Sequence, residues 1–285
     1  MKKSPSPWSI AGEKFFRNKK AMVSLGFLIF ITVISILSPY ITTDDPVKVN
    51  IRELNKAPSV EHWLGTDEGG RDVLTRLLYG GRISLVIGFS ITFIIIVIGT
   101  IIGAISGYSG GRMDDILMRL TDFIFIFPFL VFVIVLNTIF TNSGVLTLIF
   151  TISVLGWGGT ARLVRSKVLA EKENEYIQAA VSIGTSSHKI IFKHLLPNVI
   201  SIVIVQATLL LATMLVVETG LTFLGFGVPS HIPSWGHMIS AAQNPDVIRN
   251  KPWIWIPPGL MLTLTILSVN FIGEGLKDAF NPKSN

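Results

Sequence analysis

The sequence predicts an all-α integral membrane protein with six transmembrane helices. Hydrophobic residues make up 49% of the 285 residues and charged residues only 15%, whereas an average soluble domain carries about 25% charged residues. The chain contains five long runs without a charged side chain. Each is long enough to cross a hydrocarbon core of about 30 Å as a helix, and one is long enough for two helices.

The first span covers residues 21–40 and follows a basic tail, residues 1–20. Basic residues before an apolar run also begin a signal peptide. This run is longer than the apolar region of a signal peptide, however, and no small-residue cleavage site follows Tyr40. We therefore expect a retained signal anchor, with the second span at residues 83–111.

The third uncharged run, residues 123–161, is too long for a single spanning helix. A cluster of turn-forming residues lies inside it, Thr141-Asn142-Ser143-Gly144. This cluster predicts a tight hairpin between the third and fourth spans. The last two spans cover residues 195–217 and 253–273.

The distribution of Lys and Arg predicts the orientation, because cytoplasmic loops carry an excess of these residues. A cytoplasmic N-terminus places 16 of the 24 Lys and Arg residues inside and makes the C-terminus cytoplasmic as well. Residues 41–82 then form an extracellular segment, in which seven acidic residues offset six basic ones. This topology explains the net charge of +6. A stripe of Lys and Arg that would bind nucleic acid is not visible in the sequence.

A polar stretch, residues 175–198, lies between two apolar runs and predicts a helix, a bend and a second helix. Glu173 or Asn174 can begin the first helix. Gly184 supplies the permissive backbone that commonly ends one.

The same stretch contains residues suited to close packing and to a second helix. Ala179 and Ala180 remove side-chain bulk, which predicts a smooth face on the first helix. Residues 185–187 can cap the second helix. Pro197 ends that helix or restarts it, because proline lacks the N–H donor that an interior turn needs.

The spacing of Gln178-Ala179-Ala180, Gly184 and Leu196-Pro197 resembles the Glu-Ala-Ala loop in membrane subunits of ATP-binding-cassette (ABC) importers. In that family the loop docks in a groove of a cytoplasmic ATPase and converts nucleotide-driven closure into movement of the transmembrane helices. The resemblance implies this role for a coupling loop at about residues 162–197, whereas the alternative is an ordinary cytoplasmic loop. The implied coupling residues are Glu175, Gln178, Ala179, Ala180, Gly184, Leu196 and Pro197.

One of these residues departs from the family pattern. Gln178 stands where the family usually has Glu, which puts a salt bridge from this position in doubt. Glu175, about one helical turn earlier, can substitute for the missing charge.

Further motifs are similar to the C-type permease of oligopeptide, dipeptide and nickel importers. These motifs lie at residues 63–74, 156–165, 218–225 and 233–238. The resemblance covers about residues 15–282 and implies a type I ABC importer permease fold, with a permease core at residues 83–282 and a C-terminal tail at residues 283–285.

The family also implies a set of partners in the bacterial cytoplasmic membrane. They are a paralogous B-type permease that completes a heterodimer, two ABC ATPases, and an extracellular lipid-anchored binding protein. ATP and Mg²⁺ would bind to the ATPases, and the resemblance implies no cofactor or metal in this chain. The sequence itself also predicts no nucleotide site in this chain, because it lacks the Gly-rich phosphate-binding loop of P-loop nucleotide-binding proteins.

Two polar residues of the fifth span are candidates for the translocation pathway, because a polar group in hydrocarbon needs water or a partner. Glu218, at the outer end of this span, can line or gate the pathway. It can equally cap the Gly220 turn or pair at the subunit interface. Gln206, in the middle of the span, can face the pathway or bond to the partner permease.

The extracellular segment is too long and too charged for a mere connector, so we expect a folded cap on which the binding protein lands. The candidate docking residues are Asp67, Arg71, Asp72 and Trp235. The alternative is a cap that only packs on the B-type permease and stabilises the heterodimer.

The sequence favours a non-catalytic subunit of an ATP-driven peptide importer. Nickel chelates are the alternative cargo. A self-contained secondary transporter or channel is the alternative function, and it would need ionisable residues for ion coupling or a repeat with broken helices within the spans. An enzyme would need a paired nucleophile and base at membrane depth, and the sequence arranges none.

Overall fold

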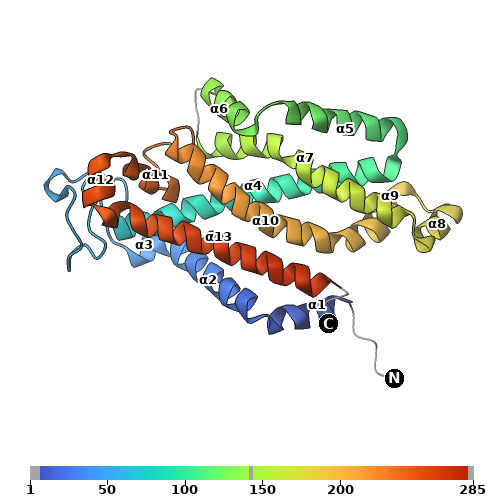
Figure 1. The fold of residues 1–285 in the computed structure, drawn as a ribbon, viewed down its shortest axis with the longest axis horizontal. Coiled ribbons are helices and arrows are strands. Elements are labelled where there is room, and N and C mark those ends of the chain that lie inside the picture. The colour runs from blue at the N-terminus through green and yellow to red at the C-terminus, as the bar shows by residue number, and fades with distance from the viewer. Residues whose placement is uncertain (1–6, 141–143, 282–285) are drawn as a thin grey trace.

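The computed structural model describes residues 7–140 and 144–281, and these residues form an all-α bundle. Most helices run along one long axis (Figure 1). The helices α1 (Pro7–Arg17), α8 (Glu175–Ser182) and α9 (Ser187–Ile190) lie toward one end of the bundle. An irregular segment, residues 42–72, lies at the opposite end.

The first predicted span is α2 (Lys19–Ile36) followed by α3 (Ser38–Ile41). Asn18 begins α2, because its side-chain oxygen accepts the backbone N–H of Ala21 at 3.2 Å. The helix breaks at Leu37, two residues before Pro39, whose ring is suited to the first turn of the next helix.

The second predicted span is part of a longer helix, α4 (Val73–Ser109), which has 37 residues and a length of about 56 Å. The helix therefore begins ten residues before the predicted span, and residue 82 lies inside it. Arg76 and Arg82 interrupt the uncharged run but not the helix. Asp72 caps α4, since its carboxylate accepts the N–H of Thr75 at 2.7 Å.

The α4 helix packs in the same direction along α7 (Val145–Lys172) through a row of glycines. Gly99, Gly103 and Gly107 recur at every fourth residue and face the backbone of α7. A Cβ atom at these positions would lie within 3 Å of α7 atoms. This is the close helix packing that small residues at four-residue spacing permit in membranes.

The third predicted span is not one straight helix. The helices α5 (Gly111–Ile126) and α6 (Phe129–Ile139) meet at an angle of 83°. Pro128 explains the break, because proline disfavours helical backbone in the residue before it, and Phe127 is extended. The predicted hairpin that follows falls on Thr141-Asn142-Ser143, which lie outside the described residues.

Ion pairs attach α5 to α7 beside this bend. Arg165 binds Asp114 through two hydrogen bonds, of 2.6 Å from Nε and 2.5 Å from Nη2. Arg162 binds Asp122 at 2.5 Å. A bidentate pair fixes orientation as well as distance, so α5 is held along α7.

The remaining chain forms a π-helical turn (Ile191–Leu195) and α10 (Leu196–Phe223), and then α11 (Trp235–Ser240), a 3₁₀ turn (Ala241–Gln243), α12 (Pro245–Asn250) and α13 (Pro252–Phe280). In the described residues, five helices are long and apolar enough to cross a membrane, and the α5–α6 pair gives a sixth if the two bent helices form one span. The fold class, an all-α multi-pass membrane protein, is confirmed.

Candidate functional site

The predicted coupling loop is a helix, a bend and a second helix, as the sequence indicates. Asn174 precedes α8, and Gly184 ends it with a left-handed φ of 78°. The Gly184 N–H donates to Val181 O at 2.9 Å, and the Thr185 N–H donates to Ala180 O at 3.0 Å. This pair of bonds satisfies the last carbonyls of α8, and glycine is the residue that adopts its geometry without strain.

The two faces of α8 differ. Ile177 and Ala180 face inward and are 0% and 7% exposed, whereas Gln178 and Ala179 face outward, and Ile183 beyond them is 82% exposed. The prediction that Ala179 and Ala180 share one smooth outer face is therefore wrong, because Ala180 packs in the chain's own core. Besides Ile177, the other buried members of this cluster are Ala104, Val164, Val168, Ile190, Leu195, Val199 and Val203.

A polar network that the sequence analysis missed fastens α8 to its neighbours. The Tyr176 hydroxyl donates to Glu171 Oε2 in α7 at 3.2 Å and accepts from Asn198 Nδ2 in α10 at 2.7 Å. Partial burial, together with the charge of Glu171, raises the pKa of Tyr176. The sequence contains one signal of this network, the polar residue Asn198, which directly follows Pro197 in an apolar run.

The second half of the element leads into α10 without a break in the helix. The backbone widens to π geometry at residues 191–195, where the Leu196 N–H donates to Ile191 O. A wider turn suits Pro197, whose ring would clash with the carbonyl four residues earlier. Ser186 precedes α9 as predicted, but its side chain forms no capping hydrogen bond to a described N–H group.

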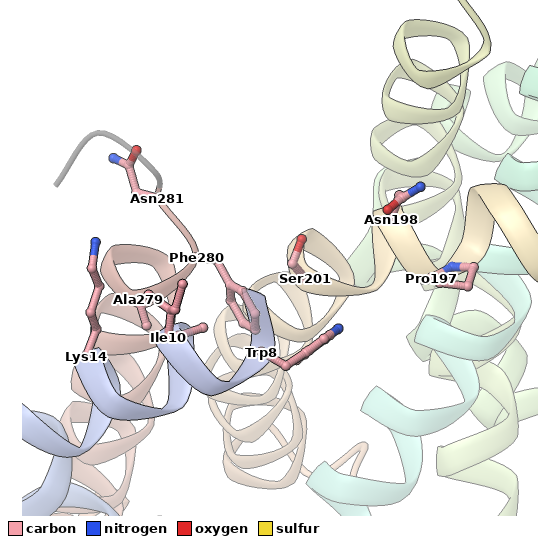
Figure 2. Close-up of a pocket in the computed structure, with 10 residues that line it drawn as sticks. Trp8, Ile10, Lys14, Pro197, Asn198, Ser201, Ala279, Phe280 and Asn281 are labelled. Carbon is pink, nitrogen blue, oxygen red and sulfur yellow. The ribbon is translucent and has the colours of Figure 1, made fainter. Parts of the chain in front are cut away.

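A hollow of about 470 Å³ lies beside this element, between α1, the start of α10 and the end of α13 (Figure 2). Pro197 and Asn198 line one side of it, and Trp8 and Phe280 line the other. The rings of Trp8 and Phe280 pack edge to face at 5.3 Å. Pro197, one of the predicted coupling residues, therefore lies beside α1 and α13.

The structure separates the two pathway candidates. Glu218 is fully buried, and its carboxylate accepts the hydroxyls of Thr222 at 3.2 Å and Thr219 at 3.3 Å. In this conformation the Glu218 side chain is therefore not exposed on a surface that substrate could contact. Gln206 is half-buried in α10 and forms no hydrogen bond to a described residue.

The cap, defined here as residues 42–72, is held together by a buried cluster of charges. Asp67 is 6% exposed and binds the guanidinium groups of Arg76 and, at 3.0 Å, Arg71. It also accepts the backbone N–H groups of Gly69 at 2.8 Å and Arg71 at 3.0 Å. Every lone-pair direction of this carboxylate is directed at a donor of the cap or of α4.

The predicted docking residues are mostly structural. Asp72 is 9% exposed, caps α4 and bonds to His62, and Trp235 is fully buried, with its indole N–H donating to Leu77 O at 3.0 Å. Together with Asp67, these residues lie inside the chain in this conformation, so their side chains offer little surface to a docking partner. Arg71 remains partly exposed.

His62 bridges two carboxylates of the cap. Its Nδ1 lies 3.0 Å from Asp72 Oδ2, and its Nε2 lies 3.1 Å from Glu53 Oε2. Partial burial alone would lower the pKa of His62, but Asp72 and Glu53 outweigh burial and raise the pKa. The three residues thus link the first half, the middle and the end of the cap.

We expect Gly184→Ala to loosen the end of α8. A non-glycine residue in left-handed geometry costs roughly 1–2 kcal/mol, so hydrogen exchange of the Gly184 and Thr185 amides should accelerate about tenfold. The matched control is Gly159→Ala, at an exposed helical position where a Cβ atom would meet no described atom within 4 Å. Equal exchange in the two variants would contradict the role of Gly184.

Comparisons with known proteins agree with this architecture. Residues 99–285 match the family model described as binding-protein-dependent transport system inner membrane component. Residues 6–58 match the N-terminal TM domain of oligopeptide transport permease C.

Curated relatives match nearly the whole chain. The oligopeptide transport system permease protein OppC of Lactococcus lactis subsp. cremoris is 41% identical over 93% of this chain and 91% of its own length. The corresponding protein of Haemophilus influenzae is 40% identical over 98% and 89%. The dipeptide transport system permease protein DppC of Bacillus subtilis is 39% identical over 96% and 85%. The chain therefore belongs to the family of binding-protein-dependent transport system inner membrane components, among the C-type permeases of peptide ABC transporters.

Proposed function

We propose that this chain is one of two membrane-spanning halves of an ATP-driven peptide importer, paired with a paralogous B-type permease. The cargo class rests on the names of the relatives, which are oligopeptide and dipeptide permeases. Two ABC ATPases would bind ATP and Mg²⁺ and contact the end of the bundle that carries α8. This end, with both chain termini, would face the cytoplasm.

The observation that carries the proposal is the construction of α8. On its inner face Ile177 and Ala180 belong to one buried cluster with residues of α4, α7 and α10, while its outer side presents Ala179, Val181 and Ile183 to a partner. Exposed apolar side chains beside a small residue suit a groove in another protein. Because α8 is attached to the ends of α7 and α10, displacement of α8 would move two spanning helices together.

The cap at the other end would receive the lipid-anchored binding protein. Exposed side chains, not the buried acids, would make this contact. Val60 is 94% exposed and Trp63 is 73% exposed, and large aromatic residues are frequent anchors of protein interfaces.

Cysteine cross-linking tests contact between α8 and the ATPase. The chain has no cysteine, so single substitutions can be introduced directly. We expect Ser182→Cys and Ile183→Cys to cross-link to an ATPase carrying one cysteine in its groove. Ala180→Cys, on the buried face, should not cross-link. Cross-linking from Ala180→Cys alone, or from none of the three in an assembled complex, would contradict the proposed contact.

A further inference from the structure

The cap has no apolar core. Residues 42–72, all of which the structure describes, bury only Thr66, Asp67 and Asp72 among side chains larger than hydrogen. The apolar side chains that remain more than 40% exposed are Val47, Val49, Ile51, Leu54, Val60 and Trp63. Small segments that bury little apolar surface usually depend on disulfides or metals, and a disulfide is not available here because the chain has no cysteine.

A group of metal-ligating side chains lies where the cap meets α4. One ligand atom each from Asp44, His62 and Asp72 can be chosen so that all three lie within 4.8 Å of one another. The residues come from the start of the cap, its middle and the N-cap of α4. They border a hollow of about 340 Å³, which Asp45 and Asn50 also line.

The distance between His62 and Asp72 suits coordination of a single ion. His62 Nδ1 and Asp72 Oδ2 are 3.0 Å apart, and two ligands at about 2.0–2.1 Å from a tetrahedral ion lie about 3.3 Å apart. His62 Nε2 faces Glu53 Oε2 at 3.1 Å. Histidines that bind metal commonly hold their other ring nitrogen against a carboxylate in this way, which fixes the orientation of the ring.

The chemistry of the ligands selects the kind of ion. Imidazole suits Zn²⁺, Cu²⁺ and Ni²⁺, whereas Ca²⁺ and Mg²⁺ prefer oxygen alone. Asp44 and Asp72 supply two negative charges, and Glu53, which also binds Lys56 at 2.8 Å, lies behind the ring. The basic residues that line the hollow are Lys48 and Arg71, and Arg71 is already paired with Asp67.

We propose that Asp44, His62 and Asp72 bind one divalent transition-metal ion of the Zn²⁺ type, with water completing its coordination. The ion joins three segments that are distant in sequence and fixes the cap on α4. Glu53 is a positioning residue, which orients His62 without touching the ion.

The test is Zn²⁺ binding by the full chain in nanodiscs, purified without a histidine tag and measured against a chromophoric chelator. Asp44→Asn removes a ligand charge from an exposed residue, so it leaves the cap folded. We expect affinity at least about tenfold weaker than in the wild type. The matched control is Asp45→Asn, because Asp45 Oδ1 accepts the N–H groups of Val47 and Lys48, a role that an amide oxygen keeps.

A second readout follows the structure of the cap. Zn²⁺ should slow hydrogen exchange across residues 44–72 in the wild type and in Asp45→Asn, and EDTA should reverse the effect. In Asp44→Asn the same Zn²⁺ concentration should have little effect. Equal affinity in all three proteins, or binding that leaves exchange in the cap unchanged, would overturn the proposal.

Discussion

Replacing Gly103 with leucine is expected to prevent α4 and α7 from packing and to abolish recovery of folded protein. A Cβ atom at Gly103 would lie 2.4 Å from the Ala161 carbonyl oxygen and 2.8 Å from the Val164 Cβ. The backbone oxygen cannot rotate away as a side chain would, so the two helices must separate. The cost should reach the upper end of the roughly 1–3 kcal/mol that overpacking causes, or exceed it. Size-exclusion chromatography of the detergent-solubilised chain measures recovery.

The control for this prediction is a leucine substitution at a glycine whose added side chain would meet open space. A Cβ atom at Gly259 in α13 would meet no described atom within 4 Å. We therefore expect Gly259→Leu to elute as the wild type does. Similar recovery of both variants would show that the glycine row of α4 is not a close-packing surface.

Removing the Asp67 carboxylate is expected to unfold the cap. Asp67→Ala would leave Arg76, which is 4% exposed, as a buried charge without its partner. Breaking a buried pair from one side costs about 3–5 kcal/mol. Hydrogen exchange across residues 50–72 should therefore rise to that of unfolded peptide, while exchange in α7 stays slow.

The neighbouring acid provides a matched comparison. Glu68 is exposed and bonds only to Asn244, at 2.7 Å, among the described residues. We expect Glu68→Ala to change cap stability by less than about 1 kcal/mol. If Asp67→Ala behaved in the same way, the buried charge cluster would not be what holds the cap.

Charge reversal at Asp67 or Asp72 would not test docking, because both carboxylates hold the cap together. Such a change would disrupt the folding of the cap, so it would not report on contact between the surface of the cap and a binding protein. Substitution of Val60 or Trp63 changes an exposed side chain instead. These are the positions at which loss of stimulation by a binding protein would report contact.

The sequence was sufficient for the spanning helices, because absence of charge over a fixed length is what the hydrocarbon core requires. It was insufficient where the backbone turns inside an apolar run. The length of the third run does not show whether its helix is straight or bent. Pro128 was the signal for the bend of 83° between α5 and α6. The start of α4 lies before the uncharged run for the opposite reason, since Arg76 is charged and yet lies within the helix.

The sequence predicted the order of helix, bend and helix at the candidate site, but not which residues of α8 are buried and which are exposed. Gly184 fixed the end of α8 correctly, because its left-handed backbone is a local property. Which alanine faces outward depends on helical phase, and the spacing of Ile177 and Ala180, three residues apart, was the signal that one face is apolar. The burial of Asp67 depends on Arg76, nine residues away across a turn, which local sequence does not reveal.

The central claim is that this chain passes ATP-driven movement from partner ATPases to a peptide pathway. Reconstitution in liposomes, with peptide uptake measured with and without ATP, tests it most directly. We predict ATP-dependent uptake by the complete complex and none by this chain alone. We also predict that Ile183→Asp, at the exposed end of α8, assembles normally and abolishes uptake, while Ile183→Leu preserves it. Peptide uptake by the single chain, or full uptake by an assembled Ile183→Asp complex, would contradict the account.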